Sequence, residues 1–250
     1  MQMNMSQANE LHEPFFNLKN GSRESGVHVF EPNAPVLSHE KLLRVQGYSN
    51  MLKVRPAILH TAQEMARRAE KLTQPCIAYK FLRIQSLDSD GIQLESGARL
   101  SSPAFQSKLA GCVELMPFVM SCGTPLSKTI IDLAEGGDLL EAVLLETAGW
   151  LCIEDATRQL KEFFRSQVDA RGYRMSSRMG PGYTYQIGAK QVHWPLEDHP
   201  AFVQLFGDSV LPATLMSSCG MSPKLSRSGL YGIAPLEPHS LQAGMSEFFN

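Results

Sequence analysis

One stretch of the chain constrains the fold most, "GGDLLEAVLLETAGWLCIEDATRQLKEFFRSQV" at residues 136–168. Its apolar residues recur at helical spacing, so it predicts one long helix beginning near Asp138. Gly149 is the one interruption, and a glycine inside a helix allows another element to pack closely against it. Glu154 and Asp155 lie near the middle of this helix, where acidic side chains usually face water. The apolar positions of the predicted helix are Leu140, Val143, Leu144, Leu151 and Phe163.

Shorter patterns precede this helix. "SHEKLLRVQGY" predicts a helix with Ser38 as its N-cap and Gly47 as its stop, and a second helix runs from Pro56 to about Leu72. "CIAYKFLRIQSL", from residue 76, alternates as a strand does. The Asp-Gly turn signal in "DSDGIQLES" leads into another strand, so an antiparallel hairpin is expected. The apolar run "GCVELMPFVMSCG" predicts a buried strand.

These elements predict the fold class and a domain organisation. Strands and long helices do not alternate regularly, which argues against a doubly wound parallel sheet. We expect an α+β fold with a mixed, mainly antiparallel twisted sheet and long packing helices. Residues 1–37 are rich in Asn, Gly, Pro and Ser and predict an irregular N-terminal arm that lies across the body. Residues 38–250 are expected to form a single α+β domain.

Composition excludes several classes of protein. The formal net charge is −2 with 43% hydrophobic residues, which argues against a disordered or membrane-spanning chain. The near-neutral net charge also argues against nucleic-acid binding, because affinity for phosphate groups depends on clustered Lys and Arg. The five cysteines include no CxxC pair, and the first residues lack the charge and apolar pattern of a signal peptide. We therefore expect reduced thiols and a cytoplasmic location.

Several familiar motifs lead to no site. "FGDSVL" would make Ser209 a nucleophile, but no correctly ordered Asp and His follow it, so a turn after an amphipathic helix is the better interpretation. His193 and His199 have the wrong spacing for one helical face, and no metal site is predicted. Cys219 lies in a loop rich in Gly and Ser and is expected to be a small buried residue.

The loop "SSRMGPGYTY" at residues 176–185 is the strongest local candidate for a binding surface. It places the fixed cation of Arg178 beside Gly180, Gly182 and Tyr183. The glycines permit positive φ and a close approach of a ligand to the main chain. An ordinary turn is the alternative interpretation of the loop alone.

Two linked motifs carry a resemblance to a known family. "RMGPGY" at 178–183 is followed by "WPLEDHPAFVQLF" and then by "LMSSCGMSPKLSRSGLYG" at 215–232. These stretches resemble the C-terminal activation domain of cobalamin-dependent methionine synthase, and are closer still to the free-standing proteins related to it. The resemblance covers roughly residues 40–235. The matching positions are Arg178, Pro181, Gly182, Tyr183, Met221, Pro223, Ser226, Ser228 and Gly229.

The resemblance implies a ligand and its contacts. Domains of this family bind S-adenosylmethionine in a shallow groove. Arg178 would pair with the ligand's carboxylate, and Tyr183 would cover a flat or cationic face. The main chain around Gly180 and Gly182 would hydrogen-bond along the ligand. Glu154 falls where the family has an acidic contact and would bind the ligand's amine or ribose; Asp155 is the alternative.

The resemblance also implies partners. The family domain docks on a corrinoid-carrying domain whose cobalt has reached the inactive Co(II) state. One electron from a flavodoxin or ferredoxin, with a methyl group from S-adenosylmethionine, restores methylcobalamin. Because this chain lacks a cobalamin-binding Asp-x-His-x-x-Gly motif, the cobalamin would belong to a separate corrinoid protein or methyltransferase. The surface facing the corrinoid is predicted at Ser217, Ser218, Cys219 and Gly220.

Departures from the family pattern leave two hypotheses. The Thr-Glu-Ser of the pattern becomes Ser217-Ser218-Cys219, and an expected aromatic residue falls near His239. One hypothesis is an S-adenosylmethionine-binding accessory protein, a methyltransferase component that supports reductive methylation. The other is a docking or chaperone-like module that has lost the nucleoside ligand. A methyltransferase unrelated to cobalamin is a more distant alternative.

Overall fold

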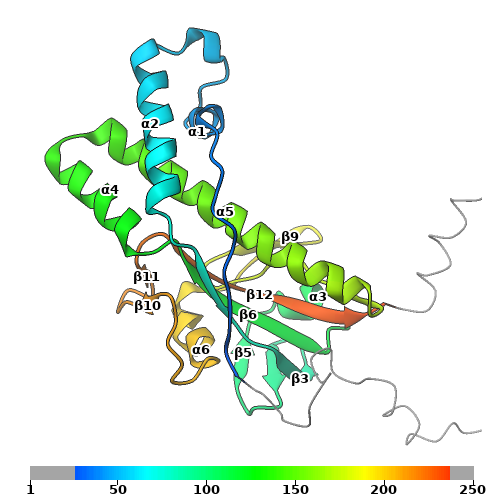
Figure 1. The fold of residues 1–250 in the computed structure, drawn as a ribbon. Helices are drawn as coiled ribbons and strands as arrows, with labels where there is room; N and C mark the ends of the chain where they lie inside the picture. The colour runs from blue at the N-terminus through cyan, green and yellow to red at the C-terminus, as the bar shows by residue number, and fades with distance from the viewer. Residues whose placement is uncertain (1–25, 237–250) are drawn as a thin grey trace, which may run out of the picture.

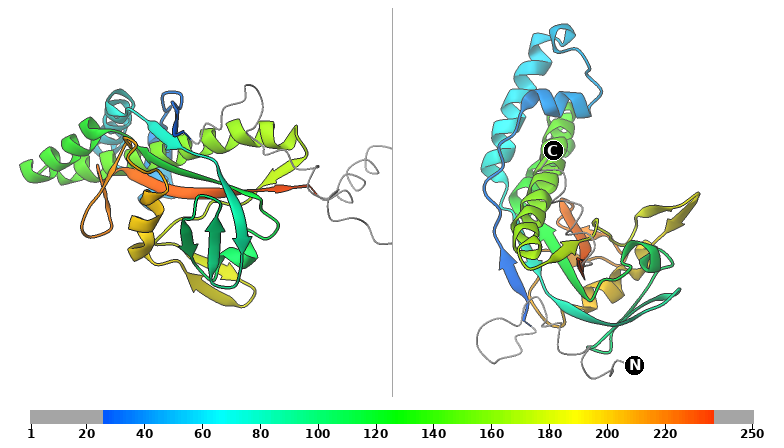
Figure 2. Two further views of the ribbon diagram at one scale, coloured as in Figure 1. Left: turned by 90° about the horizontal axis from the view of Figure 1, so that it is seen from below. Right: turned by 90° about the vertical axis from the view of Figure 1, so that its right-hand side faces the viewer.

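The computed structural model describes residues 26–236, and it has the α+β architecture that the sequence predicts (Figure 1). An eight-stranded sheet, antiparallel at every pairing, forms the middle layer. Helices α2 (Pro56–Leu72), α4 (Thr124–Gly136) and α5 (Leu139–Asp169) lie on one side of this sheet (Figure 2). Helices α3 (Phe105–Lys108) and α6 (His199–Gln204) lie on the other side. The predictions at residues 1–25, at 237–250 and at His239 lie outside the described residues.

Two long strands form the centre of the sheet. β6 (Glu114–Ser121) is buried at every position, which confirms the predicted buried strand. It pairs along its whole length with β12 (Ser226–Pro235), from Ser121 opposite Ser226 to Glu114 opposite Ile233. The remaining strands of this sheet are β1 (His28–Phe30), β2 (Cys76–Tyr79), β3 (Leu82–Leu87), β4 (Gly91–Leu94), β5 (Arg99–Ser101) and β7 (Tyr173–Met175).

The stretch predicted as one strand from residue 76 is two strands. β2 and β3 both pair with β6, and the chain leaves the ladder between them. The predicted hairpin between β3 and β4 is confirmed, because the Asp88 N–H donates to the Gly91 carbonyl at 3.0 Å. The Asp88 carboxylate accepts from the Asp90 and Gly91 N–H groups and closes the turn.

The long helix is confirmed as α5 (Leu139–Asp169), with Asp138 as its N-cap residue. Leu144 faces the core as expected, but Leu140, Val143 and Phe163 are 41–48% exposed. The buried face of the helix instead carries Leu145, Ala148, Cys152, Ile153, Ala156, Leu160 and Phe164.

Gly149 allows the close packing that the sequence predicts. A Cβ atom at this position would lie 2.3 Å from Leu225 Cδ1 and 3.2 Å from Leu126 Cδ2. The contact brings α5 against the start of β12 and against α4 (Thr124–Gly136). This close packing helps to shape the end of the sheet at which the candidate site lies.

The two upstream helices also form as predicted. In α1 (His39–Val45) the Ser38 hydroxyl caps the Lys41 N–H, and α2 (Pro56–Leu72) begins with proline. Helix α4 and strand β1 were not predicted. The rest of the described chain contains the 3₁₀ helices η1 (Met51–Lys53) and η2 (Leu196–Asp198), helices α3 (Phe105–Lys108) and α6 (His199–Gln204), and strands β8 (Thr184–Ile187), β9 (Lys190–His193), β10 (Thr214–Leu215) and β11 (Met221–Ser222).

Residues 26–37 lie against the body of the protein. β1 pairs with β2, and the ring of Phe30 contacts the ring of Phe163 on α5, with centroids 5.2 Å apart. Farther along, the Leu37 N–H donates to the Glu70 carboxylate at 2.8 Å. The domain boundary near residue 37 stays a prediction.

Residues 26–236 contain no helix with the length and apolar character needed to span a bilayer.

Candidate functional site

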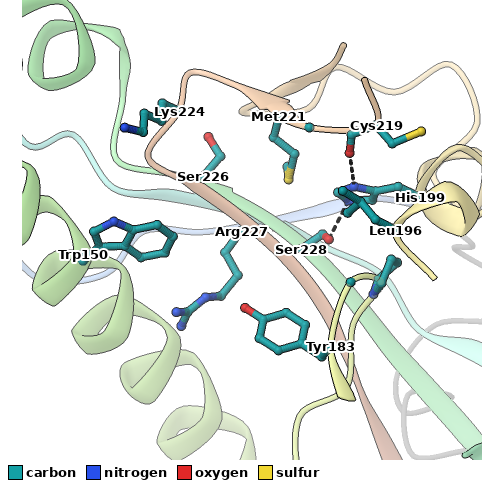
Figure 3. A pocket seen from close by; sticks show the side chains of 13 residues that line it. Trp150, Tyr183, Leu196, His199, Cys219, Met221, Lys224, Ser226, Arg227 and Ser228 are labelled. Atoms are coloured by element: carbon teal, nitrogen blue, oxygen red, sulfur yellow. Dashed lines mark hydrogen bonds between the residues drawn. The ribbon is translucent and has the colours of Figure 1, made fainter. Parts of the chain in front are cut away.

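A pocket of about 280 Å³ lies where the start of β12 meets α5, the 178–183 loop, α6 and the β10–β11 hairpin (Figure 3). Both sides of the sheet contribute to it, since Trp150 comes from α5 and His199 from α6. The lining residues are Trp150, Pro181, Gly182, Tyr183, Leu196, His199, Cys219, Gly220, Met221, Lys224, Ser226, Arg227 and Ser228.

The 178–183 loop is held by main-chain bonds on both of its sides. Met179 and Leu230 exchange two N–H to carbonyl bonds of 2.9 and 2.7 Å, which fix the loop on β12. At its other end, the Gly182 N–H donates to the Trp194 carbonyl at 2.8 Å. Gly182 has φ of +83°, the left-handed conformation that favours glycine, and it lines the pocket. The loop is therefore a built surface with a fixed shape.

Gly180 packs closely against β12, and its contact with a ligand stays a prediction. The Tyr185 hydroxyl accepts from the Gly180 N–H at 2.7 Å and donates to the Gly180 carbonyl at 3.0 Å. The main chain of Gly180 is thus already bonded within the protein, and its φ is not positive. A Cβ atom here would lie 3.1 Å from the Ser228 carbonyl oxygen, so this glycine permits the loop to approach β12.

Arg178 and Tyr183 lie together, as the sequence predicts for neighbours in one loop. The Arg178 guanidinium carbon lies 4.5 Å from the centroid of the Tyr183 ring, in cation–π geometry. Its Nη1 atom is buried and has no hydrogen-bond partner among the described residues. A buried guanidinium N–H that bonds nothing is uncommon, because its desolvation is uncompensated. Arg178 itself does not line the pocket, although Tyr183 does, so this unpaired donor lies next to the pocket wall.

Glu154 already has a partner. Its carboxylate accepts a short hydrogen bond from Arg227 Nη2, and Arg227 Nη1 donates to Thr157 Oγ1 at 3.3 Å. This hydrogen bond from Arg227 is the main cause that lowers the pKa of Glu154. The alternative residue, Asp155, bonds Arg158 and Gln159 on the same helix.

Arg227 was missed by the sequence analysis, although it lines the pocket. It occupies the variable position of the Ser-x-Ser-Gly motif, which gives no local signal for a buried cation. Strand alternation was the available clue, because Arg227 and Ser228 must face opposite sides of the sheet. Arg227 faces α5, whereas Ser228 faces α6.

His199 joins two parts of the pocket wall. Its Nδ1 lies 2.8 Å from the Cys219 carbonyl oxygen and its Nε2 lies 2.7 Å from Ser228 Oγ (Figure 3). The carbonyl can only accept, so Nδ1 carries the proton and the neutral ring accepts from the Ser228 hydroxyl at Nε2. Burial lowers the pKa of His199 below its ordinary value of 6.5. His193, by contrast, contacts Thr184 on the β8–β9 hairpin.

Lowering the pH from about 8 to about 5 is expected to reduce the free energy of unfolding through His199. Between the lowered pKa of the folded state and the ordinary pKa of the unfolded state, the unfolded chain binds more protons. The stability due to neutral His199 is therefore complete above about pH 6.5 and is lost as the pH falls below it. The pKa of Glu154 lies below 4.5, so Glu154 contributes little within this range.

Urea denaturation at a series of pH values measures this effect. His199→Gln removes the titrating ring, so its free energy of unfolding should change less between about pH 7 and pH 5 than that of the wild type. Equal pH dependence in the two proteins would show that His199 is not the group responsible.

The predicted corrinoid-facing segment forms the loop of the β10–β11 hairpin. Cys219 and Gly220 line the pocket, whereas Ser217 and Ser218 are exposed outside it. Cys219 has φ of +61° and is half-buried, so it is less buried than expected. Ser209 is exposed in the turn after α6, as predicted.

Comparisons with known proteins find a similar solved structure. No protein-family model matches the chain, and no curated protein matches it. The crystal structure of the MetH reactivation domain bound to AdoHcy is similar, with a TM-score of 0.57. The match covers 84% of this chain and 79% of that chain at 16% sequence identity. The two share a fold. At this identity the likeness supports the fold that the sequence motifs implied, and the ligand is that domain's own.

Proposed function

We propose that this protein binds S-adenosylmethionine and supports the reductive methylation and reactivation of a separate corrinoid protein or methyltransferase. The observation that carries the proposal is the buried Nη1 of Arg178, which has no partner among the described residues and lies beside a pocket. The fold adds support, because a structure with the same fold holds AdoHcy, the demethylated form of this ligand.

The pocket and the neighbouring Arg178 offer groups that suit each end of the ligand. Arg178 would donate to the ligand's carboxylate from its available Nη1, a charge-assisted bond. Trp150 and Tyr183 are about two-fifths exposed and line the pocket, so they provide faces for a flat adenine or a cationic sulfonium. In this proposal Gly182 supplies the close approach of the main chain at the mouth of the pocket.

The partner would supply the corrinoid chemistry. The partner's corrinoid would accept the methyl group of the sulfonium after a flavodoxin or ferredoxin had supplied one electron, and S-adenosylhomocysteine would leave. In this chain, the part of the pocket wall formed by Cys219 and Gly220 would hold the S-adenosyl ligand near the partner. Ser217 and Ser218 are exposed at the tip of the same hairpin, where they could contact the partner.

A docking or chaperone-like module is the second candidate function. The ion pair between Glu154 and Arg227 favours it, since the acidic group that would bind the ligand's amine is already engaged. Under this hypothesis the protein would bind the corrinoid protein without the nucleoside.

Calorimetry with the purified full chain tests the proposal. We expect S-adenosylmethionine and S-adenosylhomocysteine to bind with Kd values between about 10 μM and 1 mM. Methylthioadenosine lacks both the carboxylate and the amine, so it should bind more weakly and serves as the control ligand. Absence of heat and of a thermal shift at millimolar concentrations of either ligand would overturn the S-adenosyl proposal.

A second step tests the partner. A folded corrinoid protein in the Co(II) state, mixed with this protein, S-adenosylmethionine and a low-potential reductant, should give the absorption spectrum of methylcobalamin. A perturbed Co(II) spectrum without methylation, together with no ligand binding, would favour the docking module. An unperturbed spectrum would count against this partner for both functions.

A further inference from the structure

Arg227 is a buried cation at the centre of the candidate site. It belongs to β12, and its side chain is 6% exposed. Figure 3 shows it extending between Trp150 and Tyr183. Its guanidinium bonds Glu154 and Thr157 on α5, while its Nε has no hydrogen-bond partner among the described residues.

The carboxylate of Glu154 is surrounded by positive charge. Arg227 is its direct partner, and Arg178 and Lys41 also act on it electrostatically. Its side chain remains 62% exposed, so a ligand could reach it. A ligand's ammonium group would meet the nearby guanidinium as well as the carboxylate, and like charges repel.

Arg178 and Glu154 do not line the pocket themselves, but each contacts a residue that does, and the two offer different conditions to a ligand. An anionic group finds the available N–H of Arg178, whereas a cationic group must compete with Arg227 for Glu154. The inference drawn from this contrast concerns the candidate site and rests on the proposed function.

We propose that Arg227 is a specificity-determining residue: by holding Glu154 it makes the pocket insensitive to a ligand's α-amino group and selective for S-adenosyl compounds that present a carboxylate. The wild-type protein should therefore distinguish poorly between S-adenosylhomocysteine and an analogue in which hydrogen replaces the α-amino group. Both ligands keep the carboxylate and the adenosine, so only the amine is compared.

Arg227→Met tests this inference without removing the apolar stem of the side chain. Replacing one member of a buried ion pair with an apolar residue is tolerated when the other member can be hydrated. Glu154 meets that condition because most of its side chain is exposed. Arg227→Gln is a second variant, and circular dichroism would verify that both variants fold.

The experiment compares two ligands on each protein by calorimetry, as a mutation-by-ligand cycle. We expect the amine to change the affinity of the wild type by less than about 3-fold. In Arg227→Met the released Glu154 should bind the amine, so S-adenosylhomocysteine should bind at least about 10-fold more tightly than its deamino analogue.

Lys224→Met is the matched control. Lys224 also lines the pocket, and its Nζ lies 2.6 Å from the Glu146 carboxylate. The substitution removes the same charge from the same pocket but leaves Arg227 on Glu154. Even if Lys224→Met changes both affinities, the ratio of the affinities for S-adenosylhomocysteine and its deamino analogue should stay as in the wild type.

The outcomes separate this inference from the proposed function. A wild-type preference of about 10-fold for the amine, or the same gain in Lys224→Met as in Arg227→Met, would overturn the inference while leaving S-adenosyl binding intact. No gain in either Arg227 variant, with binding by the wild type, would also overturn it. Binding of S-adenosylhomocysteine by Arg227→Met alone would overturn the inference, because the wild type would then select no S-adenosyl ligand, and would assign the wild type to the docking function. No binding by any of the proteins would overturn both.

Discussion

Gly229→Ala is expected to lower the free energy of unfolding by about 2–3 kcal/mol. A Cβ atom at Gly229 would lie 2.8 Å from the Met179 carbonyl oxygen and 3.2 Å from two ring atoms of Phe118. That carbonyl accepts the Leu230 N–H at 2.7 Å, so it cannot move without losing the bond that holds the 178–183 loop on β12. Urea denaturation measures the loss.

The same substitution should weaken binding of S-adenosylhomocysteine, because displacement of Met179 also displaces the adjoining Arg178. Gly26→Ala is the control: a Cβ atom there meets nothing within 4 Å, and the residue does not have a positive φ. It should leave the free energy of unfolding within about 0.5 kcal/mol of the wild type. Wild-type stability in Gly229→Ala would show that the loop and β12 can separate at little cost.

Arg178→Met is expected to weaken binding of S-adenosylhomocysteine about 10- to 150-fold, the value of a charge-assisted hydrogen bond of about 1.5–3 kcal/mol. The buried Nη1 of Arg178 bonds nothing among the described residues, so the substitution should cost no more than about 1 kcal/mol of stability, the value of the cation–π contact with Tyr183. Calorimetry gives the affinity, and a thermal melt of the unliganded protein tests the predicted small loss of stability.

Arg174→Met is the matched control for Arg178→Met. Arg174 is an exposed arginine on β7 whose Nη2 donates to the Ala110 carbonyl at 3.4 Å. Its removal changes the net charge equally and should leave ligand affinity unchanged. A large loss of stability in Arg178→Met, with affinity unchanged, would assign Arg178 a structural role and contradict the proposed one.

The sequence predicted the elements that carry a long apolar pattern of their own. Helix α5 and strand β6 carry long apolar patterns, and both formed where expected. Strand β1 has three residues, and its conformation depends on pairing with β2, which lies far along the chain. Helix α4 had a usable signal in Pro125 at its first turn, which the sequence analysis did not use.

The contacts of the candidate site also differ in how far the sequence could predict them. Arg178 and Tyr183 are five residues apart in one loop, so their contact could be expected from the sequence alone. Arg227 reaches Glu154 across 73 residues, and His199 reaches Ser228 across 29 residues. Such contacts depend on the register of β12 against α5 and α6, and no local pattern encodes them.

The alternation of side chains along β12 restricts how this chain can change in length. Arg227 contacts α5 and Ser228 contacts His199 on the other face, although they are consecutive residues. A shift of β12 by one residue along β6 would exchange the two faces, placing the guanidinium beside the imidazole and the hydroxyl beside Glu154. A shift by two residues would preserve the faces. In related chains, therefore, residues inserted or deleted within the paired part of β12 should be even in number, whereas the loop before Ser226 can change in length by any number.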